Sequence, residues 1–229
     1  MRSKNLLLIF AFALLIECLA IVFNLTAVQY VSKPSLMLIL GCYFAANSRR
    51  LGRQKSLIIA ALVFSWIGDV VLLAEKKFAW LFVIGLASFL IAHIFYVVYF
   101  WQIRKINSVG VKIKLFPVIA VLAYSLTFYF FLLPNVGTLK IPILFYTVII
   151  SLMLIASFQA FDLSTQSFGR ICVAGALLFT LSDSILAYNR FVSPIPFGGA
   201  FVMLTYALGQ LLIAEGALRN LNYINNRLT

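Results

Sequence analysis

Two aspartates stand inside long apolar stretches of the chain, where an ionised side chain is costly. Asp69 lies in the apolar run 56–74 and Asp183 in the run 169–188, each five residues before the end of its run. At bilayer depth an ionisable side chain costs roughly 2.5–3.5 kcal/mol even on the lenient insertion scale, so it faces the protein interior and marks a functional site. Five helical residues place each carboxyl about 7–8 Å deep. Two carboxyls at one depth can divide acid and base roles between them.

Lys33 and Tyr146 are expected at the same depth as the two aspartates. Lys33 precedes the run 34–46 and enters the membrane from the same side, so it can pair with either carboxylate. Tyr146 lies about 8–9 Å down the run 141–161 and can donate a hydrogen bond. The alternative is that an aspartate caps a helix break or pairs with Lys33 for structure alone.

His93, Tyr206 and Gln210 are expected in a deeper layer. His93 is the single histidine of the chain, and counting along the run 78–101 places it about 20 Å below the outer end. Tyr206 and Gln210 stand four residues apart and share one helix face. These residues predict a second polar layer along a long cavity, unless the ends of the runs differ from those assigned. The alternative for His93 is a simple hydrogen bond between helices.

Other chemistries have no matching pattern. A lone histidine and the absence of an HExxH motif exclude a multi-histidine zinc site. The cysteines Cys18, Cys42 and Cys172 are scattered in apolar surroundings and are interpreted as small hydrophobic residues. No G-x-S-x-G elbow is present for a serine nucleophile. We therefore expect no metal and no organic cofactor.

The composition defines the elements that must position these side chains. Of the 229 residues, 64% are hydrophobic and 10% are charged, against about 25% charged residues in soluble domains. The sequence predicts an all-α, polytopic membrane bundle of eight transmembrane helices forming one domain over residues 1–229. The expected helices are 6–23, 34–46 (extended back through 27–33), 56–74, 78–101, 113–132, 141–161, 169–188 and 195–218.

The net charge of +12 predicts an orientation rather than a nucleic-acid partner, because Lys and Arg accumulate in cytoplasmic loops. Thirteen of the 18 basic residues fall on one side of the predicted spans and five on the other. Both termini are therefore expected in the cytoplasm. The short loops favour a bacterial inner membrane, and the alternative is the endoplasmic reticulum, where a family member would look similar. Glu17 occupies the position where a signal-peptidase site needs a small residue, so the first helix is interpreted as uncleaved. The role of Glu17 itself stays open.

The two halves of the chain resemble each other weakly. Lys33-Pro34 precedes the second helix, and Lys140-Ile141-Pro142 opens the sixth. Asp69 and Asp183 both follow an aromatic–hydroxyl pair and precede a leucine by three residues. Because four helices per half preserve the orientation, the pattern predicts a parallel repeat of two four-helix units.

Together these segments resemble a known family. The following stretches carry the resemblance: Lys33-Pro34, Gly68-Asp69, Gly85-x-x-Ser88-Phe89-x-x-Ala92-His93-x-x-Tyr96, Phe179-Thr180-Leu181-Ser182-Asp183-Ser184-x-x-Ala187 and Tyr206-x-x-x-Gln210-x-x-Ile213. The chain is similar over about 33–218 to the YhhN/TMEM86 family of lysoplasmalogenases. The resemblance implies an integral membrane hydrolase that cleaves the vinyl ether bond of lysoplasmalogens. The products would be a fatty aldehyde and a glycerophospho-ethanolamine or -choline.

This chemistry suits the residues. Vinyl ether hydrolysis starts with protonation of an alkene carbon and continues with addition of water to the resulting oxocarbenium ion. One of Asp69 and Asp183 is predicted to stay protonated as general acid, while the other, nearer Lys33, stays ionised and positions water. Which is which stays open, and Lys33 can alternatively hold the substrate phosphate. His93, Tyr146, Tyr206 and Gln210 would orient the head group or water.

Two other functions fit buried acids in a helical bundle. An ion-coupled transporter of small solutes or lipids also uses repeated halves and intramembrane carboxyls. The aspartates lie off the midplane and few helices are broken, which speaks mildly against it. A structural or lipid-binding membrane protein would tolerate loss of both aspartates. The expected partners are therefore a lysophospholipid substrate and the surrounding membrane lipids.

Overall fold

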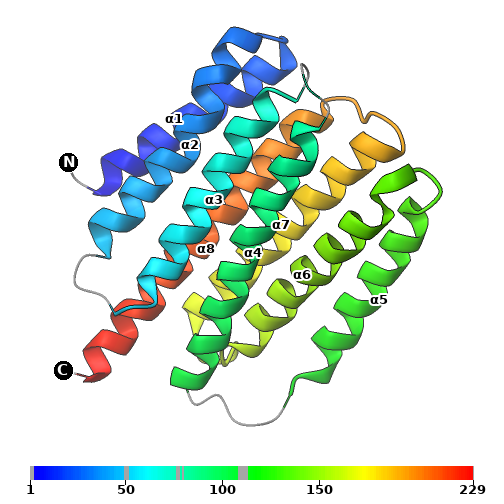
Figure 1. The fold of residues 1–229 in the computed structure, drawn as a ribbon. Helices are drawn as coiled ribbons and strands as arrows, with labels where there is room; N and C mark the ends of the chain where they lie inside the picture. The colour runs from blue at the N-terminus through cyan, green and yellow to red at the C-terminus, as the bar shows by residue number, and fades with distance from the viewer. Residues whose placement is uncertain (1–2, 49–51, 76–77, 79, 108–112, 229) are drawn as a thin grey trace.

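Apolar runs without helix-breaking residues fold into long helices, and eight such helices build the molecule (Figure 1). The structure is a computed structural model that describes residues 3–48, 52–75, 78, 80–107 and 113–228. The helices are α1 (Ser3–Val22), α2 (Thr26–Asn47), α3 (Lys55–Leu73), α4 (Leu81–Ile106), α5 (Leu115–Leu132), α6 (Lys140–Gln159), α7 (Ser167–Phe191) and α8 (Gly198–Leu228), with a short 3₁₀ turn, η1 (Gly137–Leu139), before α6. The eight predicted helices are confirmed.

Several helix ends differ from the prediction. α4 ends at Ile106 rather than 101, α7 at Phe191 rather than 188, and α8 at Leu228 rather than 218. The apolar pattern ends where the membrane ends, but backbone hydrogen bonding continues through polar residues until a breaker intervenes. The segments that follow 101, 188 and 218 contain neither Gly nor Pro before the helix ends. Hydropathy therefore locates the apolar part of each helix and misses its polar extension.

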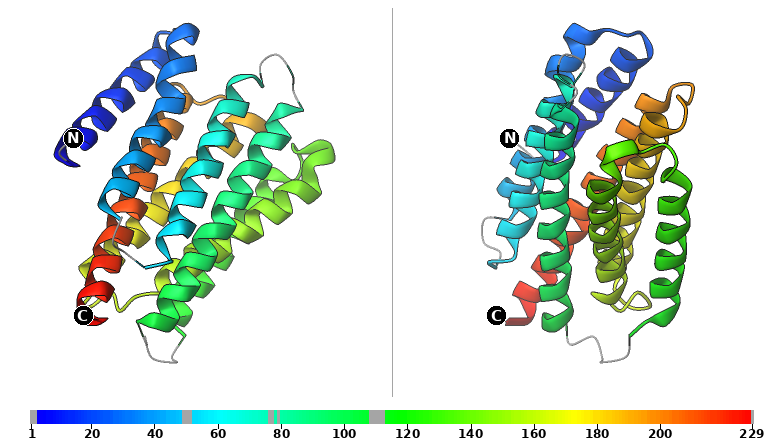
Figure 2. Two further views of the ribbon diagram at one scale, coloured as in Figure 1. Left: turned by 60° about the vertical axis from the view of Figure 1, so that its left-hand side comes forward. Right: turned by 45° about the vertical axis from the view of Figure 1, so that its right-hand side comes forward.

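The helices alternate in direction and lie side by side (Figure 1). The α1–α2 hairpin forms one edge of the bundle and α5 the other, where it packs on α6. Figure 2 shows from two more sides that α8 ends at the same end of the bundle as α4.

The helices carry the surface of an integral, multi-pass membrane protein. Seven of them are long and apolar enough to cross a membrane: α1 and α3 to α8. α2 is long enough, with 22 residues, and is more polar because it carries Gln29, Ser32 and Lys33. Large apolar side chains such as Phe116, Val31 and Leu8 are 83%, 72% and 71% exposed, which suits contact with lipid tails.

The predicted orientation across the membrane depends on charges that the structure covers only in part. Arg2, Arg49, Arg50, Lys76, Lys77 and Lys112 lie outside the described residues. The cytoplasmic location of the termini therefore stays a prediction.

α7 and α8 pack with their backbones in direct contact. A Cβ atom at Gly175 would lie 2.7 Å from the Gly209 carbonyl oxygen, and one at Gly209 would lie 2.9 Å from the Gly175 oxygen. Both distances are shorter than side-chain atoms tolerate, so the two backbones meet directly at these glycines. Small residues at such a crossing are the usual device of membrane helices. The contact fixes α8 beside α7, on which Asp183 lies.

Candidate active site

Two helices bring polar side chains to the Asp183 carboxyl on α7. The Tyr146 hydroxyl on α6 donates a hydrogen bond of 2.6 Å to Oδ2 of Asp183. The Nε2 atom of His93, on α4, lies 3.5 Å from the same oxygen. His93 is fully buried. The three residues, which we call the Asp183 cluster, combine a carboxyl, an imidazole and a phenol in one place.

The hydrogen bonds of His93 determine which ring nitrogen carries a proton. Its Nδ1 lies 2.7 Å from the carbonyl oxygen of Phe89, one turn earlier on α4. A carbonyl only accepts, so Nδ1 is the donor and the neutral ring keeps its lone pair on Nε2. Nε2 is buried and has no other hydrogen-bond partner. A proton on Asp183 would therefore point at an acceptor, and a proton on His93 would point at a carboxylate.

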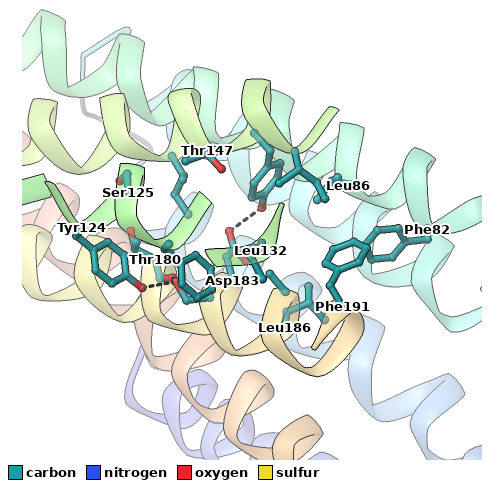
Figure 3. Close-up of a pocket in the computed structure, with 16 residues that line it drawn as sticks. Phe82, Leu86, Tyr124, Ser125, Leu132, Thr147, Thr180, Asp183, Leu186 and Phe191 are labelled. Atoms are coloured by element: carbon teal, nitrogen blue, oxygen red, sulfur yellow. Dashed lines mark hydrogen bonds between the residues drawn. The ribbon is translucent and has the colours of Figure 1, made fainter. Parts of the chain in front are cut away.

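A cavity of about 70 Å³ adjoins the Asp183 carboxyl, enough for a few water molecules (Figure 3). It lies between α4, α5, α6 and α7, and most of the side chains lining it are apolar, among them Phe82, Leu86, Leu132 and Phe191. Tyr124 lines the same cavity and is 45% exposed, so the cavity reaches the outer surface beside α5. A lipid chain in the membrane therefore has a short path to the acid.

The Asp69 carboxyl on α3 has a different set of partners. Nζ of Lys33, on α2, lies 3.8 Å from Oδ1, and the Tyr206 hydroxyl on α8 donates a hydrogen bond of 2.8 Å to Oδ2. Asp69 is 1% exposed. We call these three residues the Asp69 cluster. The sequence left open which carboxylate Lys33 pairs with, and the structure pairs it with Asp69. None of the three residues lines the cavity beside Asp183.

An aromatic ring connects the two clusters. The Phe179 ring centroid on α7 lies 4.6 Å from that of His93 and 5.4 Å from that of Tyr206. Tyr206 also packs edge-on against Phe89, with 5.7 Å between centroids. The clusters are thus neighbours in the bundle core, each carboxyl satisfied by its own partners.

Gln210 belongs to a third group of polar side chains. Its amide nitrogen donates to the Ser65 hydroxyl at 2.8 Å, and its amide oxygen accepts a hydrogen bond from Tyr96. All three are fully buried. The sequence placed Gln210 among the substrate-binding residues. In the structure Gln210 belongs to an interhelical hydrogen-bond network that does not line the cavity.

The predicted depth of His93 is wrong. The sequence placed it well below the aspartates, but its ring contacts Asp183. Two helix ends account for much of the error: α4 begins at Leu81 rather than 78, and α7 continues to Phe191 rather than 188. Each difference of three residues brings the two side chains closer by about 4.5 Å along the membrane normal. Tyr206 was likewise placed too deep, because it bonds Asp69 directly.

Glu17, left without a role by the sequence, has a specific partner. The Ser32 hydroxyl on α2 donates a hydrogen bond of 2.5 Å to Oε2 of Glu17, which is 1% exposed. Ser32 directly precedes Lys33 in the chain. The sequence offered two signals for this pair. Glu17 is an acid within the first apolar run, and Ser32 stands beside Lys33, the only basic residue of the second run.

Within the described part of the chain, no three His, Cys, Asp or Glu side chains gather as a metal site would require. The polar groups present are proton donors and acceptors set in an apolar helical bundle. The fold and the two carboxyl clusters define a multi-pass membrane protein with acid–base groups beside a cavity that is accessible from lipid.

The chain belongs to the YhhN family, whose sequence model matches residues 28–217. It is similar to curated lysoplasmalogenases. The mouse lysoplasmalogenase TMEM86B is 34% identical over 170 residues, which cover 74% of this chain and 66% of the relative. The human TMEM86B is 30% identical over 209 residues, covering 91% and 76%. A Mycobacterium tuberculosis lysoplasmalogenase is 28% identical over 186 residues, covering 80% and 68%.

The chain thus spans between about two thirds and three quarters of the length of these relatives. No solved structure matches it. The family match includes both aspartates, Lys33 and His93, and it starts after Glu17. The predicted family is confirmed.

Proposed function

We propose that this protein is a membrane lysoplasmalogenase, which hydrolyses the vinyl ether bond of a lysoplasmalogen. The similarity to curated lysoplasmalogenases over most of the chain supports the reaction. The observation that carries the proposal is the Asp183 carboxyl beside a largely apolar cavity that reaches the lipid-facing surface. Such a site suits a substrate whose reacting bond lies at the top of its hydrocarbon chain. A carrier function is not favoured by the relatives.

Asp183 is the proposed proton donor in the first step. Its proton goes to the second carbon of the vinyl ether, while the alkene electron pair forms the new C–H bond. The first carbon and the ether oxygen then share the positive charge of an oxocarbenium ion. The carboxylate left behind stabilises this cation at short range in an apolar site, where charge interactions are strong.

His93 and Tyr146 control the state of that proton. Tyr146 donates a hydrogen bond to Oδ2 of Asp183, and Nε2 of His93 lies 3.5 Å from the same oxygen. A proton on Oδ2 therefore faces the Nε2 lone pair, which can accept that proton and give it back. No Lys or Arg of the described chain forms an ion pair with Asp183 that would hold it ionised.

Water completes the reaction in the second step. The Asp183 carboxylate accepts a proton from a water molecule as that water adds to the first carbon of the oxocarbenium ion. The hydroxyl proton of the resulting hemiacetal is then transferred to the glycerol oxygen, the bond between that oxygen and the first carbon breaks, and the products are the alcohol and the aldehyde. The cavity has space for the water beside the acid.

Asp69 is the proposed positioning residue. Lys33 at 3.8 Å favours its ionised form, and the anion holds the Tyr206 hydroxyl. Tyr206 packs on Phe179, which in turn packs on His93. The ion pair thereby fixes the ring that faces Asp183. Asp183 then acts on the substrate alone, whereas the sequence analysis expected one aspartate to protonate the substrate and the other to position water.

The location proposed for the enzyme is the cytoplasmic membrane of a bacterium, with both chain ends in the cytoplasm. The excess of basic residues on the side of the termini supports this orientation. The Asp183 cluster would then lie in the half of the membrane that faces away from the cytoplasm. Fusions of a reporter enzyme to the C-terminus and to the α5–α6 connection should show opposite sidedness.

Aldehyde release from a lysoplasmalogen tests the proposed reaction. The purified protein in detergent should release one fatty aldehyde per substrate, and it should leave the saturated alkyl ether analogue intact. In D₂O, immediate borohydride trapping should give an alcohol with one deuterium at its second carbon, since the proton added there comes from an exchangeable group. Folded protein that releases no aldehyde would contradict the proposal.

A further inference from the structure

An ion pair lies at one end of the cavity, two helical turns from Asp183. Nη1 of Arg190, on α7, lies 2.8 Å from Oε1 of Glu75, which follows α3. Arg190 is seven residues after Asp183, so it occupies the same face of α7, about 10.5 Å along its axis. The pair is therefore placed above the acid, toward the end of the helix.

Two rings connect this ion pair to the cavity. The Arg190 guanidinium carbon lies 4.6 Å from the centroid of the Phe82 ring. Phe82 packs edge-on against Phe191 with 5.9 Å between centroids, and both rings line the cavity. Figure 3 shows them side by side at one end of the cavity, with Asp183 farther along it. The side chains of the pair are 37% and 24% exposed, so polar ligand groups can reach them.

The spacing matches that between the reacting carbon and the phosphorus of a lysoplasmalogen. Seven bonds separate the carbon that accepts the proton from the phosphorus atom. An extended chain advances about 3.3–3.6 Å per three bonds, so these seven bonds span roughly 8 Å. The long Arg190 side chain makes up the remaining difference. A substrate with its vinyl ether at Asp183 thus places its phosphate near the guanidinium.

We propose that Arg190 and Glu75 form the head-group subsite, in which Arg190 binds the phosphodiester and Glu75 binds the ammonium group of a zwitterionic head group. The inference rests on the proposed function and assigns a substrate class to the same cavity. In the free protein each charge satisfies the other. When substrate binds, Arg190 exchanges Glu75 for the phosphate, and Glu75 exchanges Arg190 for the ammonium group. Both side chains therefore keep a partner of opposite charge. Planar guanidinium groups bind phosphate oxygens with two parallel hydrogen bonds.

Lys33, the other candidate for the phosphate, is committed elsewhere. It pairs with Asp69 and its side chain is 16% exposed. It lies on α2, outside the four helices that line the cavity. Arg190 lies on one of those helices and is more exposed. The geometry therefore favours Arg190.

Three substrates separate the contributions of the head-group charges. The ethanolamine lysoplasmalogen carries both charges, the alkenyl glycerophosphate lacks the ammonium, and the alkenylglycerol lacks the phosphate as well. The measurement is kcat/KM for aldehyde release from each, in wild-type protein and in Arg190→Gln, Arg190→Lys and Glu75→Gln. Arg219→Gln is the matched control, because Arg219 forms a 2.8 Å ion pair with Glu215 near the far end of α8.

Arg190→Gln should lower kcat/KM for both phosphate-bearing substrates about tenfold to a hundredfold relative to the alkenylglycerol, mainly through KM. Arg190→Lys should recover part of this loss. Glu75→Gln should instead lower the preference for the ethanolamine substrate over the glycerophosphate, by about threefold to tenfold. Arg219→Gln should change none of these ratios.

Equal losses on all three substrates in Arg190→Gln would assign Arg190 a structural role and overturn the subsite. Unchanged ratios in Arg190→Gln, with wild-type protein active and Asp183→Asn inactive, would overturn the subsite while the proposed function stands. Wild-type protein that releases no aldehyde from any of the three would overturn both. If Arg190→Gln does not fold, the Glu75→Gln ratio decides in its place.

Discussion

The two carboxyl clusters are built from matched positions of the two halves of the chain. Each aspartate is held by one side chain from the helix before it and one from the fourth helix of the other half. The pairs are Lys33 and Tyr206 for Asp69, and Tyr146 and His93 for Asp183. This exchange is the arrangement expected of two four-helix repeats, although duplication itself stays a prediction.

The clusters differ in the charge of their partners and in access. Asp69 pairs with a lysine and is enclosed, whereas Asp183 faces an imidazole and a phenol beside a cavity. A fixed cation stabilises a carboxylate, while a neutral acceptor leaves a carboxyl free to gain and lose a proton. The comparison indicates that one scaffold can give its two acids different roles by changing their partners and their access to a cavity. The following predictions test this difference.

Asp183→Asn is expected to have the largest effect. Asparagine keeps the shape and the acceptor for Tyr146 but cannot supply the proton. Turnover of a lysoplasmalogen should fall about 10²- to 10⁴-fold, the usual contribution of a general acid or base. Asp69→Asn, made in parallel, should lower turnover only about tenfold. Equal losses in the two variants would remove the proposed division of roles.

His93→Asn should have the next largest effect, since it removes the acceptor that faces Asp183 while leaving the cavity lining intact. We expect kcat to fall about tenfold to a hundredfold with KM nearly unchanged. The pH profile of kcat should also change shape, which a purely structural role would not produce. Phe179→Leu serves as a comparison, because it alters packing around His93 without removing a titratable group.

Lys33→Met tests the Asp69 cluster through stability. It leaves a buried carboxylate without its cation, which should destabilise the protein by about 3 kcal/mol. The thermal unfolding midpoint in detergent should fall accordingly. Adding Asp69→Asn should restore part of the loss, because the remaining uncompensated charge is removed. A double variant less stable than Lys33→Met alone would contradict the ion pair.

Glu17→Gln is expected to have the smallest effect. The amide keeps an acceptor for the Ser32 hydroxyl, and Glu17 lies before the part of the chain that the family model matches. Turnover should change by less than about threefold, within the range of a neutral hydrogen-bond exchange. A loss comparable to that of Asp69→Asn would extend the Asp69 cluster to α1.

Much of the fold could be predicted from the sequence, since apolar runs of membrane length leave little choice other than helices. The same pattern identified both aspartates and placed Lys33 and Tyr146 at their depth, but it did not decide which aspartate each of them contacts. The contact of His93 with Asp183 could not be predicted, because it depends on polar helix extensions and on how far helices are shifted along one another. The hydropathy pattern gives neither the length of these extensions nor the shift between helices.

The sequence also could not predict that the cavity adjoins Asp183 while the ion pair with Lys33 belongs to Asp69. Asp69 and Asp183 both follow an aromatic–hydroxyl pair and precede a leucine by three residues, so only the packing of α4 to α7 could reveal which carboxyl borders open space. Arg190 gave no signal because it stands at a helix end, where basic residues are common. Its relation to Asp183 becomes visible only when α7 is known to continue to Phe191.

Photoaffinity labelling with a non-hydrolysable substrate analogue tests the central claim most directly. The analogue is an alkyl ether lysophospholipid with a diazirine next to the ether oxygen, and labelled peptides are identified by mass spectrometry. The account predicts labelling of the cavity residues of α5, α6 and α7, with most label near Asp183 and competition by lysoplasmalogen. Competable labelling concentrated on α2 and α3 around Asp69 would contradict it.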